Sequence, residues 1–352
     1  MQGEGAILRV LNYPFDPPEP GELREIADGV HWIRMPLPFK PDHINLWLLR
    51  DEFDGAPGWT VVDTGFAAEA TRDLWLKLLD GAMGRLPVGR IVVTHFHPDH
   101  VGCARWLAER TGATVWMTLG EFLSAHASAS DTAGFDRANS MHHFLQHGLH
   151  LLFPEANKAS LRESSGERKE PPVPKSFQRM FHRGTLVIGG RDWQVITAFG
   201  HAPEHATLYT ANGEILIAGD QILPTITPNI SVWGNQPEAN PLQLYINGLA
   251  QFDGLPEDTL VLPSHGKVFR GLAARLAALR VHHAQQLETV LAALATPKCA
   301  GEIVGVLFPR KLDEMQRVLA MGETIAHLNL LWQGGSVLRI RGEDGLWRFR
   351  RV

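Results

Sequence analysis

The sequence is poor in cysteine, with only Cys103 and Cys299 among its 352 residues. So few cysteines cannot build the disulfide framework of a small secreted domain, and this sparse use is typical of a reducing compartment. A long apolar run is also lacking, because no segment reaches the ~18 uninterrupted apolar residues of a membrane-spanning helix. Residues 1–11 lack the basic and apolar segments of a secretory signal. We therefore expect a cytoplasmic protein with no membrane span.

A large excess of one charge sign is absent as well. The formal net charge is -5 at pH 7, which provides no global field to attract a polyanion. Nucleic acid is therefore disfavoured as the main partner, although a local basic patch stays open. The one marked excess is histidine, with 17 residues. This abundance directs attention to the spacing of histidines along the chain, because neutral imidazole is a common metal ligand.

Predicted strands and helices alternate along the first 270 residues, which indicates an α/β fold with layered elements. Residues 120–180 interrupt this alternation, and we interpret them as a cap insertion in a catalytic domain at 1–272. The cap is expected to hold helices at 120–128 and 136–150 and a polar, proline-rich stretch at 163–175. The other predicted strands are 30–35, 44–50, 59–63, 90–93, 185–188, 193–198, 206–210, 214–218 and 259–263, and the other predicted helices are 67–79, 99–110 and 241–252.

The last 80 residues, 273–352, predict a separate unit with three helices and a terminal hairpin. The helices are expected to run to about Leu294, over 301–308 and over 312–333. The strands 337–341 and 346–351 flank Asp344-Gly345, a strong turn signal. This order is typical of a winged-helix domain. The unit has 11 Lys and Arg against 7 Asp and Glu, so nucleic acid stays open. Its third helix is acidic, however, and its apolar residues are expected to pack on the catalytic domain or on a second subunit of a homo-oligomer.

Four potential metal ligands follow directly after the predicted strand 90–93. His95 and His97 share one face of the extended strand end, because alternate side chains point the same way. Pro98 suits the first turn of a helix, which brings Asp99 and His100 beneath the same point. Imidazole nitrogen and carboxylate oxygen suit zinc, and iron or manganese are also chemically admissible. Solvated loop histidines are the alternative, but four donors in six residues favour a metal site.

Three further donors each follow a predicted strand and a small residue. His201 comes after Gly200, Asp220 after Gly219 and His265 after Ser264. Each of them alone is as compatible with a turn residue as with a ligand. Their repeated placement after strands predicts that they reach the same edge of the fold as the first four.

The H-x-H-x-D-H pattern of His95 to His100 resembles that of the metallo-β-lactamase superfamily, and the resemblance extends over about residues 20–275. It implies an αββα sandwich with two divalent metal ions, zinc first and iron or manganese as alternatives. By this resemblance His95, His97 and His201 hold one ion, Asp99, His100 and His265 hold the other, and Asp220 bridges both.

Two residues outside the ligand set are also matched by the family. Asp63, in Asp63-Thr64-Gly65, is implied to support the ligands from behind, although a plain turn is an equal alternative. His205 is implied to be structural. Cys103 is expected to be a small buried thiol on the helix that begins at Pro98.

The resemblance implies hydrolysis by a metal-bound hydroxide, with Asp99 orienting the nucleophile as a catalytic residue. The fold alone does not determine the substrate, and we expect an ester or thioester of a small molecule. The C-terminal unit resembles a winged-helix domain found on many such hydrolases, including endoribonucleases, so RNA cleavage is the first alternative. A catalytically silent metal-binding regulator is the second. The cap, and within it Phe144 and His147, is expected to cover the metal site and select an apolar acyl group.

Overall fold

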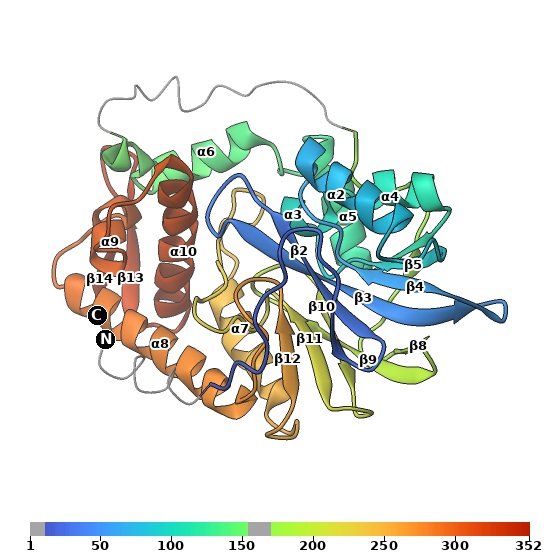
Figure 1. Ribbon diagram of the computed structural model, residues 1–352. Helices are drawn as coiled ribbons and strands as arrows, with labels where there is room; N and C mark the ends of the chain where they lie inside the picture. Colours follow the sequence, from blue (N-terminus) through green and yellow to red (C-terminus); the bar gives the residue numbers. More distant parts are fainter. Residues whose placement is uncertain (1–10, 154–169) are drawn as a thin grey trace.

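The computed structural model describes residues 11–153 and 170–352 (Figure 1). Predictions for the opening ten residues, and for most of the proline-rich stretch at 163–175, lie outside the described residues. One sheet has seven strands in the order of the sequence, antiparallel from the first to the fourth and parallel from the fourth onward. Its strands are β1 (Arg24–Ala27), β2 (Val30–Pro36), β3 (His43–Phe53), β4 (Ala56–Val62), β5 (Val88–Val92), β6 (Thr114–Met117) and β7 (Gln178–Arg179).

The second sheet has five strands in the order β12-β11-β10-β9-β8. Its strands are antiparallel except for the parallel pair β11 and β12. The parallel pair matters for the site, because it ends two neighbouring strands at the same sheet edge. The strands are β8 (Thr185–Ile188), β9 (Arg191–Ala198), β10 (His205–Thr210), β11 (Ile215–Gly219) and β12 (Leu260–Pro263).

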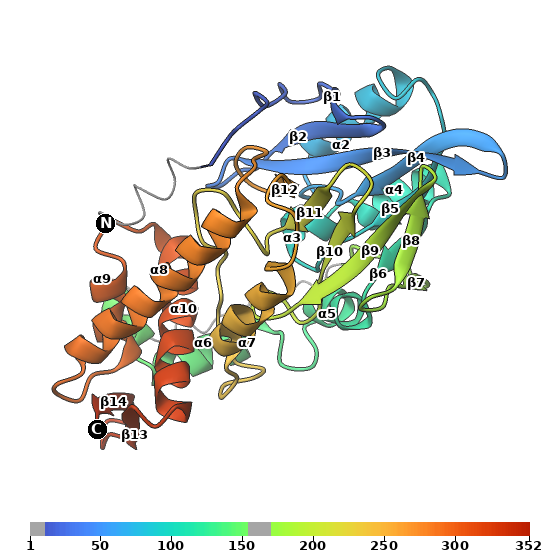
Figure 2. The ribbon, with the colours of Figure 1, turned by 90° about the horizontal axis from the view of Figure 1, so that it is seen from below.

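Helices cover the outer face of each sheet, which completes four layers and confirms the predicted αββα sandwich (Figures 1 and 2). The first sheet is covered by α2 (Glu69–Asp80), α4 (Ala104–Thr111) and α5 (Leu119–Ala129). The second is covered by α7 (Pro241–Gly248), η4 (Leu249–Phe252), α8 (Leu272–Ala293), α9 (Ala300–Leu307) and α10 (Glu314–Gln333).

Both faces of the second sheet are buried, and apolar side chains of its strands point alternately to one face and to the other. In β11, Ile215 and Ile217 join the core between the sheets, whereas Leu216 and Ala218 join the core beneath the helices. Successive side chains of a strand point to opposite faces, so two apolar cores require a continuous apolar run. The strand Ile215-Leu216-Ile217-Ala218 is such a run.

The predicted helix 99–110 is broken in the structure into α3 (Pro98–Val101) and α4. Gly102 lies at the break, and a Cβ built there would be 2.4 Å from the Pro98 carbonyl oxygen and 2.6 Å from the Ala67 nitrogen. Only glycine fits this close approach of three backbone segments. The break places the turn with Asp99 and His100 independently of the longer helix behind it. Cys103 is buried there, as predicted, and burial raises the pKa of its thiol to about 11.

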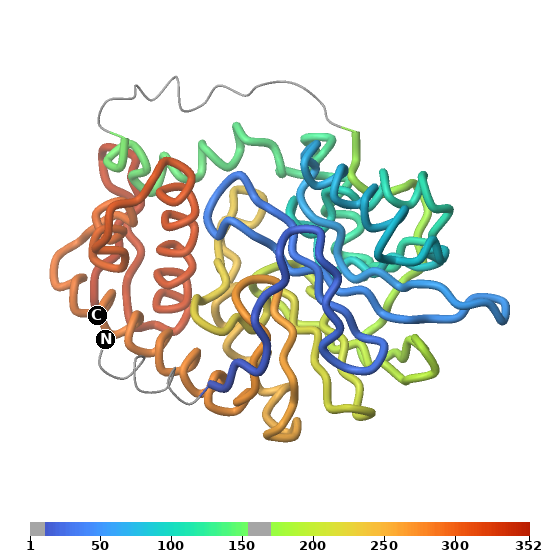
Figure 3. The backbone as a smooth tube through the Cα atoms, in the orientation of Figure 1, coloured from blue at the N-terminus to red at the C-terminus, as the bar shows by residue number. Residues whose placement is uncertain are grey.

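The predicted cap divides into two parts, because its first helix, α5, packs on the first sheet, whereas its later part meets the C-terminal helices. Figure 3 shows the chain of α6 (Arg137–Gln146) running across to that unit, where η2 (Leu149–Leu152) contacts α9 and α10. Phe144 is fully buried, and His147 is 2% exposed and stacked on Phe349. The expectation that these two side chains contact substrate is therefore wrong, because both are buried, Phe144 against Trp233 and His147 against the C-terminal unit.

The C-terminal elements form where they were predicted, with β13 (Val337–Arg341) paired to β14 (Trp347–Arg351) after the three helices. The apolar residues of α10 pack within this chain, since Ile325, Leu328 and Leu331 share one core with Leu216 and Val261 of the second sheet. Along the described residues, no helix is long and apolar enough to cross a membrane.

Candidate metal centre

The seven predicted donors converge at one edge of the sandwich. They lie in the loops that follow β5, β9, β11 and β12 and, for Asp99 and His100, in the short helix α3 that continues the first of these loops. Carboxyl ends of strands commonly meet at such an edge, where loops can bring side chains from distant parts of the chain together. Two groups form there, one with His95, His97, His201 and Asp220, and the other with Asp99, His100 and His265.

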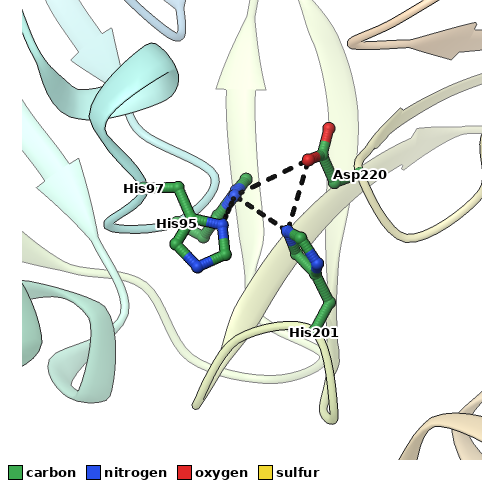
Figure 4. Close-up of side chains that lie close together, drawn as sticks. All are labelled: His95, His97, His201 and Asp220. Carbon is green, nitrogen blue, oxygen red and sulfur yellow. Dashed lines mark hydrogen bonds and ion pairs between the residues drawn. The ribbon is translucent and has the colours of Figure 1, made fainter. Parts of the chain in front are cut away.

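The first group surrounds a common point (Figure 4). His95 Nε2 lies 2.9 Å from His97 Nδ1 and 3.2 Å from His201 Nε2. Asp220 Oδ2 lies 3.2 Å from His201 Nε2 and 4.0 Å from His95 Nε2. Donors placed tetrahedrally about 2.1 Å from a zinc ion stand roughly 3.4 Å apart, so the spacing fits one such cation.

The second group uses the other oxygen of the same aspartate. Asp220 Oδ1 lies 3.4 Å from His100 Nε2 and 3.5 Å from His265 Nε2. Asp99 Oδ2 lies 3.4 Å from His265 Nε2 and 3.8 Å from His100 Nε2. One carboxylate thus faces both groups, each with a different oxygen, as a bridge between two cations would.

Hydrogen bonds from behind hold the ligand rings in place. Asp63 Oδ2 lies 2.8 Å from His100 Nδ1 and accepts from Thr94 Oγ1, while Asp63 Oδ1 accepts from the Thr94 nitrogen. The other ring nitrogens of His201 and His265 face carbonyl oxygens of Asn229 and His43, at 2.8 and 2.9 Å. Such partners leave Nε2 of each ring available to a metal.

His205 lies inside the structure next to the donors without joining either group. It is fully buried, and its Nε2 accepts from the backbone nitrogen of Asp220 at 3.1 Å. Its ring therefore fixes the start of the loop that carries the Asp220 carboxylate. This contact agrees with a structural role for His205.

Glu121 of α5 is a functional residue that the sequence did not reveal. Its two oxygens accept from the nitrogen of Phe96 at 2.9 Å and from that of Glu204 at 2.6 Å. One buried carboxylate thereby joins the loop of His95 and His97 to the loop of His201. Burial raises the pKa of Glu121 to about 8, although the two backbone bonds oppose this. In sequence it is an ordinary acidic residue in the first turn of a helix, so no local signal sets it apart.

Electrostatics of the site favour a cation. Burial alone would raise the pKa of Asp220, but the imidazoles of His100 and His265 outweigh it and hold that pKa well below its usual range. Burial lowers the pKa of His97 to about 3, so its ring is neutral at pH 7, as a metal ligand must be. Burial would also lower the pKa of His100, yet Asp220 and Asp63 raise it well above its usual value. In the metal-free chain, protons on His100 thus balance carboxylates that a metal ion would neutralise instead.

Two buried atoms of the site fit the same interpretation. His100 Nε2 and Asp220 Oδ1 are both shielded from solvent and make no hydrogen bond of good geometry, because the 3.4 Å between them is an ion-pair contact only. Coordination of a cation would satisfy both atoms, so the donor set fits two divalent metal ions.

Apolar side chains are exposed on loops that carry or contact the donors. Phe39, Ile226 and Trp233 are 44%, 45% and 38% exposed. Phe39 lies in the loop that leads to His43, and the other two lie between Asp220 and α7. Exposed apolar side chains on loops of this kind can contact an apolar part of a ligand.

Two family models match successive parts of the chain. The family model described as the metallo-beta-lactamase superfamily matches residues 39–265. The model described as the metallo-beta-lactamase-like, C-terminal domain matches residues 287–352. An uncharacterized protein of Aquifex aeolicus is 25% identical over 230 residues, which are 65% of this chain and 87% of that protein.

Two solved structures resemble the whole chain. A beta-lactamase domain protein from Burkholderia ambifaria is 44% identical, with a TM-score of 0.88 over 99% of this chain and 100% of that chain. A metallo-beta-lactamase family protein from Thermus thermophilus is 29% identical, with a TM-score of 0.75 over 93% of this chain and 100% of that chain. These two proteins therefore share both the sandwich and the C-terminal unit with this chain.

Proposed function

Because the chain belongs to the metallo-β-lactamase superfamily, whose members are generally metal-dependent hydrolases, we propose that it hydrolyses an ester or thioester of a small, partly apolar molecule. The observation that carries the proposal is the placement of Asp220, whose two oxygens face two separate groups of donors. Such a carboxylate supports a site for two divalent ions, with zinc the first choice for nitrogen and oxygen donors.

The bound ions would polarise the substrate carbonyl and activate water at neutral pH. Water adds to the carbonyl carbon, the bond to the oxygen or sulfur of the leaving group breaks, and a proton passes to that group. Asp99 suits the orientation of this water, because its side chain is 15% exposed and carries a carboxylate next to the ligand rings. His265 and His100 hold that carboxylate ionised and lower its pKa to about 2, against the effect of burial.

The rim supports the choice of an apolar acyl substrate. Phe39, Ile226 and Trp233 offer the exposed apolar surface that an acyl group can bury. A nucleic-acid rim would instead present Arg and Lys to phosphates. Two arginines of the terminal hairpin already have partners within the chain that would compete with phosphate groups. Arg348 pairs with Asp344, and Arg339 lies 3.6 Å from the Trp332 ring centre. RNA cleavage and a silent metal-binding role therefore stay alternatives.

A substrate screen on zinc-loaded protein tests the proposal. The protein should contain two ions per chain and turn over acyl esters or thioesters, while structured RNA should stay intact. Asp220→Ala should lose both turnover and metal, and Asp192→Ala, an exposed aspartate on β9, should lose neither. RNA as the sole substrate, or at most one ion per chain after zinc supplementation, would refute the proposed function.

A further inference from the structure

We propose that the C-terminal helix α10 positions the metal ligand His201, acting through Glu323 and Asn229. The inference rests on the proposed function, because it takes His201 to be a metal ligand. It gives the C-terminal unit a direct part in the metal centre. The structural basis is the loop between β11 and α7, which passes between His201 on one side and α10 on the other.

A chain of polar contacts crosses this loop. His201 Nδ1 lies 2.8 Å from the carbonyl oxygen of Asn229, to which the protonated nitrogen donates. The side chain of the same asparagine donates through Nδ2 to Glu323 Oε2 of α10, at 3.1 Å. Asn229 therefore contacts the ligand with its backbone and the helix with its side chain. A shift of Glu323 would move the carbonyl group that orients the ring.

The backbone of α10 holds the next residues of the loop. The nitrogen of Val232 donates to the carbonyl oxygen of Gly322 at 3.1 Å. A Cβ built on Gly322 would lie 2.7 Å from both Cβ and Oγ of Ser231, so the loop rests directly on the glycine. Ser231 Oγ in turn donates to Asn229 Oδ1 at 2.7 Å. The loop is thus docked on the helix by contacts on both sides of Glu323 and Asn229.

The burial of Glu323 indicates a specific role. Its exposure is 8%, and burial raises the pKa of its carboxyl group to about 7, against the hydrogen bond from Asn229. Burying a carboxyl group costs free energy unless partners compensate, so a buried glutamate is costly for packing alone. An apolar residue would serve helix packing better. The hydrogen bond to Asn229 is the contact for which a polar side chain is needed.

Removing the group that contacts a metal-bound histidine weakens metal binding by about 10- to 100-fold, and Glu323 acts one contact farther out, through Asn229. Glu323→Leu should therefore lower the affinity of one of the two metal sites by up to that factor and leave the other site unchanged. Glu323→Gln keeps an oxygen that accepts from Asn229 and should retain an affinity close to that of the wild type. Asn229→Ala removes the donor, keeps the backbone carbonyl group, and should weaken the same site as Glu323→Leu.

Asn329 provides the matched control on the same helix. It is also buried, and its Nδ2 donates to the carbonyl oxygens of Pro237 and Ala239, farther along the same loop. Asn329→Ala thus removes comparable hydrogen bonds between α10 and the loop without touching the path to His201. It should lower the melting temperature of the metal-free protein but not the affinity for metal.

The measurement is competition of the full-length protein against a chelator, with zinc for affinity and cobalt for the absorption spectrum of each site. The proposal would be overturned by an unchanged metal affinity in both Glu323→Leu and Asn229→Ala, or by an equal loss of affinity in Asn329→Ala. Either result would leave the proposed function intact, provided that the wild-type protein binds two ions. A wild type that binds no metal would instead overturn the proposed function, and this inference with it. If Glu323→Leu fails to fold, Asn229→Ala decides the outcome, because that residue is only partly buried.

Discussion

The Glu121 carboxylate ties together the two loops that carry His95, His97 and His201. Each of its oxygens accepts one backbone N–H, so neither can be replaced by a donor without leaving a buried nitrogen unpaired. Its hydrogen bonds fix the backbone between His95 and His97 and three residues after His201, whereas ring nitrogens of His100 and His265 are held by Asp63 and His43. The two groups therefore respond differently to a change at this position.

We predict that Glu121→Gln weakens metal binding at the first group and lowers stability by about 1–3 kcal/mol, because an amide NH₂ would face one backbone N–H. Chelator competition and thermal unfolding measure the two effects. Glu302→Gln is the control, because Glu302 also accepts a backbone N–H, that of Cys299, but lies at the start of α9. Equal losses at both metal sites would contradict a role confined to the first group.

Single residues also mark the limit of what the sequence predicts. The donors His95 to His100 were predictable because they lie in one short run after a strand, and the other three because each follows a strand end. Glu121 and Asn229 were not, since their importance depends on which loop the folded chain places beside them. An acidic residue in a first turn and an asparagine in a loop have the same local sequence character whether or not they support a ligand.

At the scale of elements, Gly322 of α10 shows a conflict between helix propensity and close packing. A glycine inside a helix costs about 1 kcal/mol relative to alanine, because it gains flexibility in the unfolded chain. The helix keeps it where the loop of Ser231 approaches most closely. Close packing against the loop therefore outweighs helix propensity at this position.

Gly322→Ala should consequently destabilise the protein and weaken metal binding at His201, although alanine is the better helix former. Gly305→Ala in α9 is the matched control, because no atom lies within 4 Å of a Cβ built there, and it should stabilise the protein by about 1 kcal/mol. Melting temperatures and zinc affinities of both variants provide the test. A stabilising effect of Gly322→Ala, with unchanged zinc affinity, would show that the loop does not depend on this contact.

Most strands and helices were predictable, because apolar alternation and helical spacing are local properties of the sequence. The short strands β1, β6 and β7 escaped prediction, since two to four residues carry too little periodicity. The break between α3 and α4 escaped it for another reason. Gly102 is required there by the backbone of Gly65 and Ala67, which is distant in sequence.

At the scale of the whole molecule, the cap, the second sheet and the C-terminal unit share one core. Buried residues of β11 and β12 pack in the same cluster as Leu149, Leu276, Ile303 and Leu328. Sequence periodicity predicts that each of these helices has a buried face but not which surface covers it. This is why the whole cap was expected over the metal site, whereas only its first part, with Glu121 and Phe135, contacts a loop that carries donors and η2 is found against α9 and α10.

We predict that a chain ending at Arg270 is poorly soluble, because the missing helices would leave the outer face of the second sheet exposed to water. It should retain the seven donors yet bind metal more weakly than the full chain, since Glu323 is absent. Centrifugation, binding of a hydrophobic dye and chelator competition measure these properties, and residues 271–352 supplied as a second chain should restore solubility. A soluble, fully active fragment would show that the C-terminal unit folds and functions independently.

The docking of α10 also sets an order of events during synthesis. Every donor, from His95 to His265, leaves the ribosome before Glu314, where α10 begins. A nascent chain can therefore encounter metal ions when all seven ligands have emerged but the helix behind Asn229 has not. On the proposed role of α10, we expect ions captured at that stage to exchange more freely and later docking of α10 to slow their release. The late position of the helix in the chain thus separates the time of metal capture from the time of metal retention.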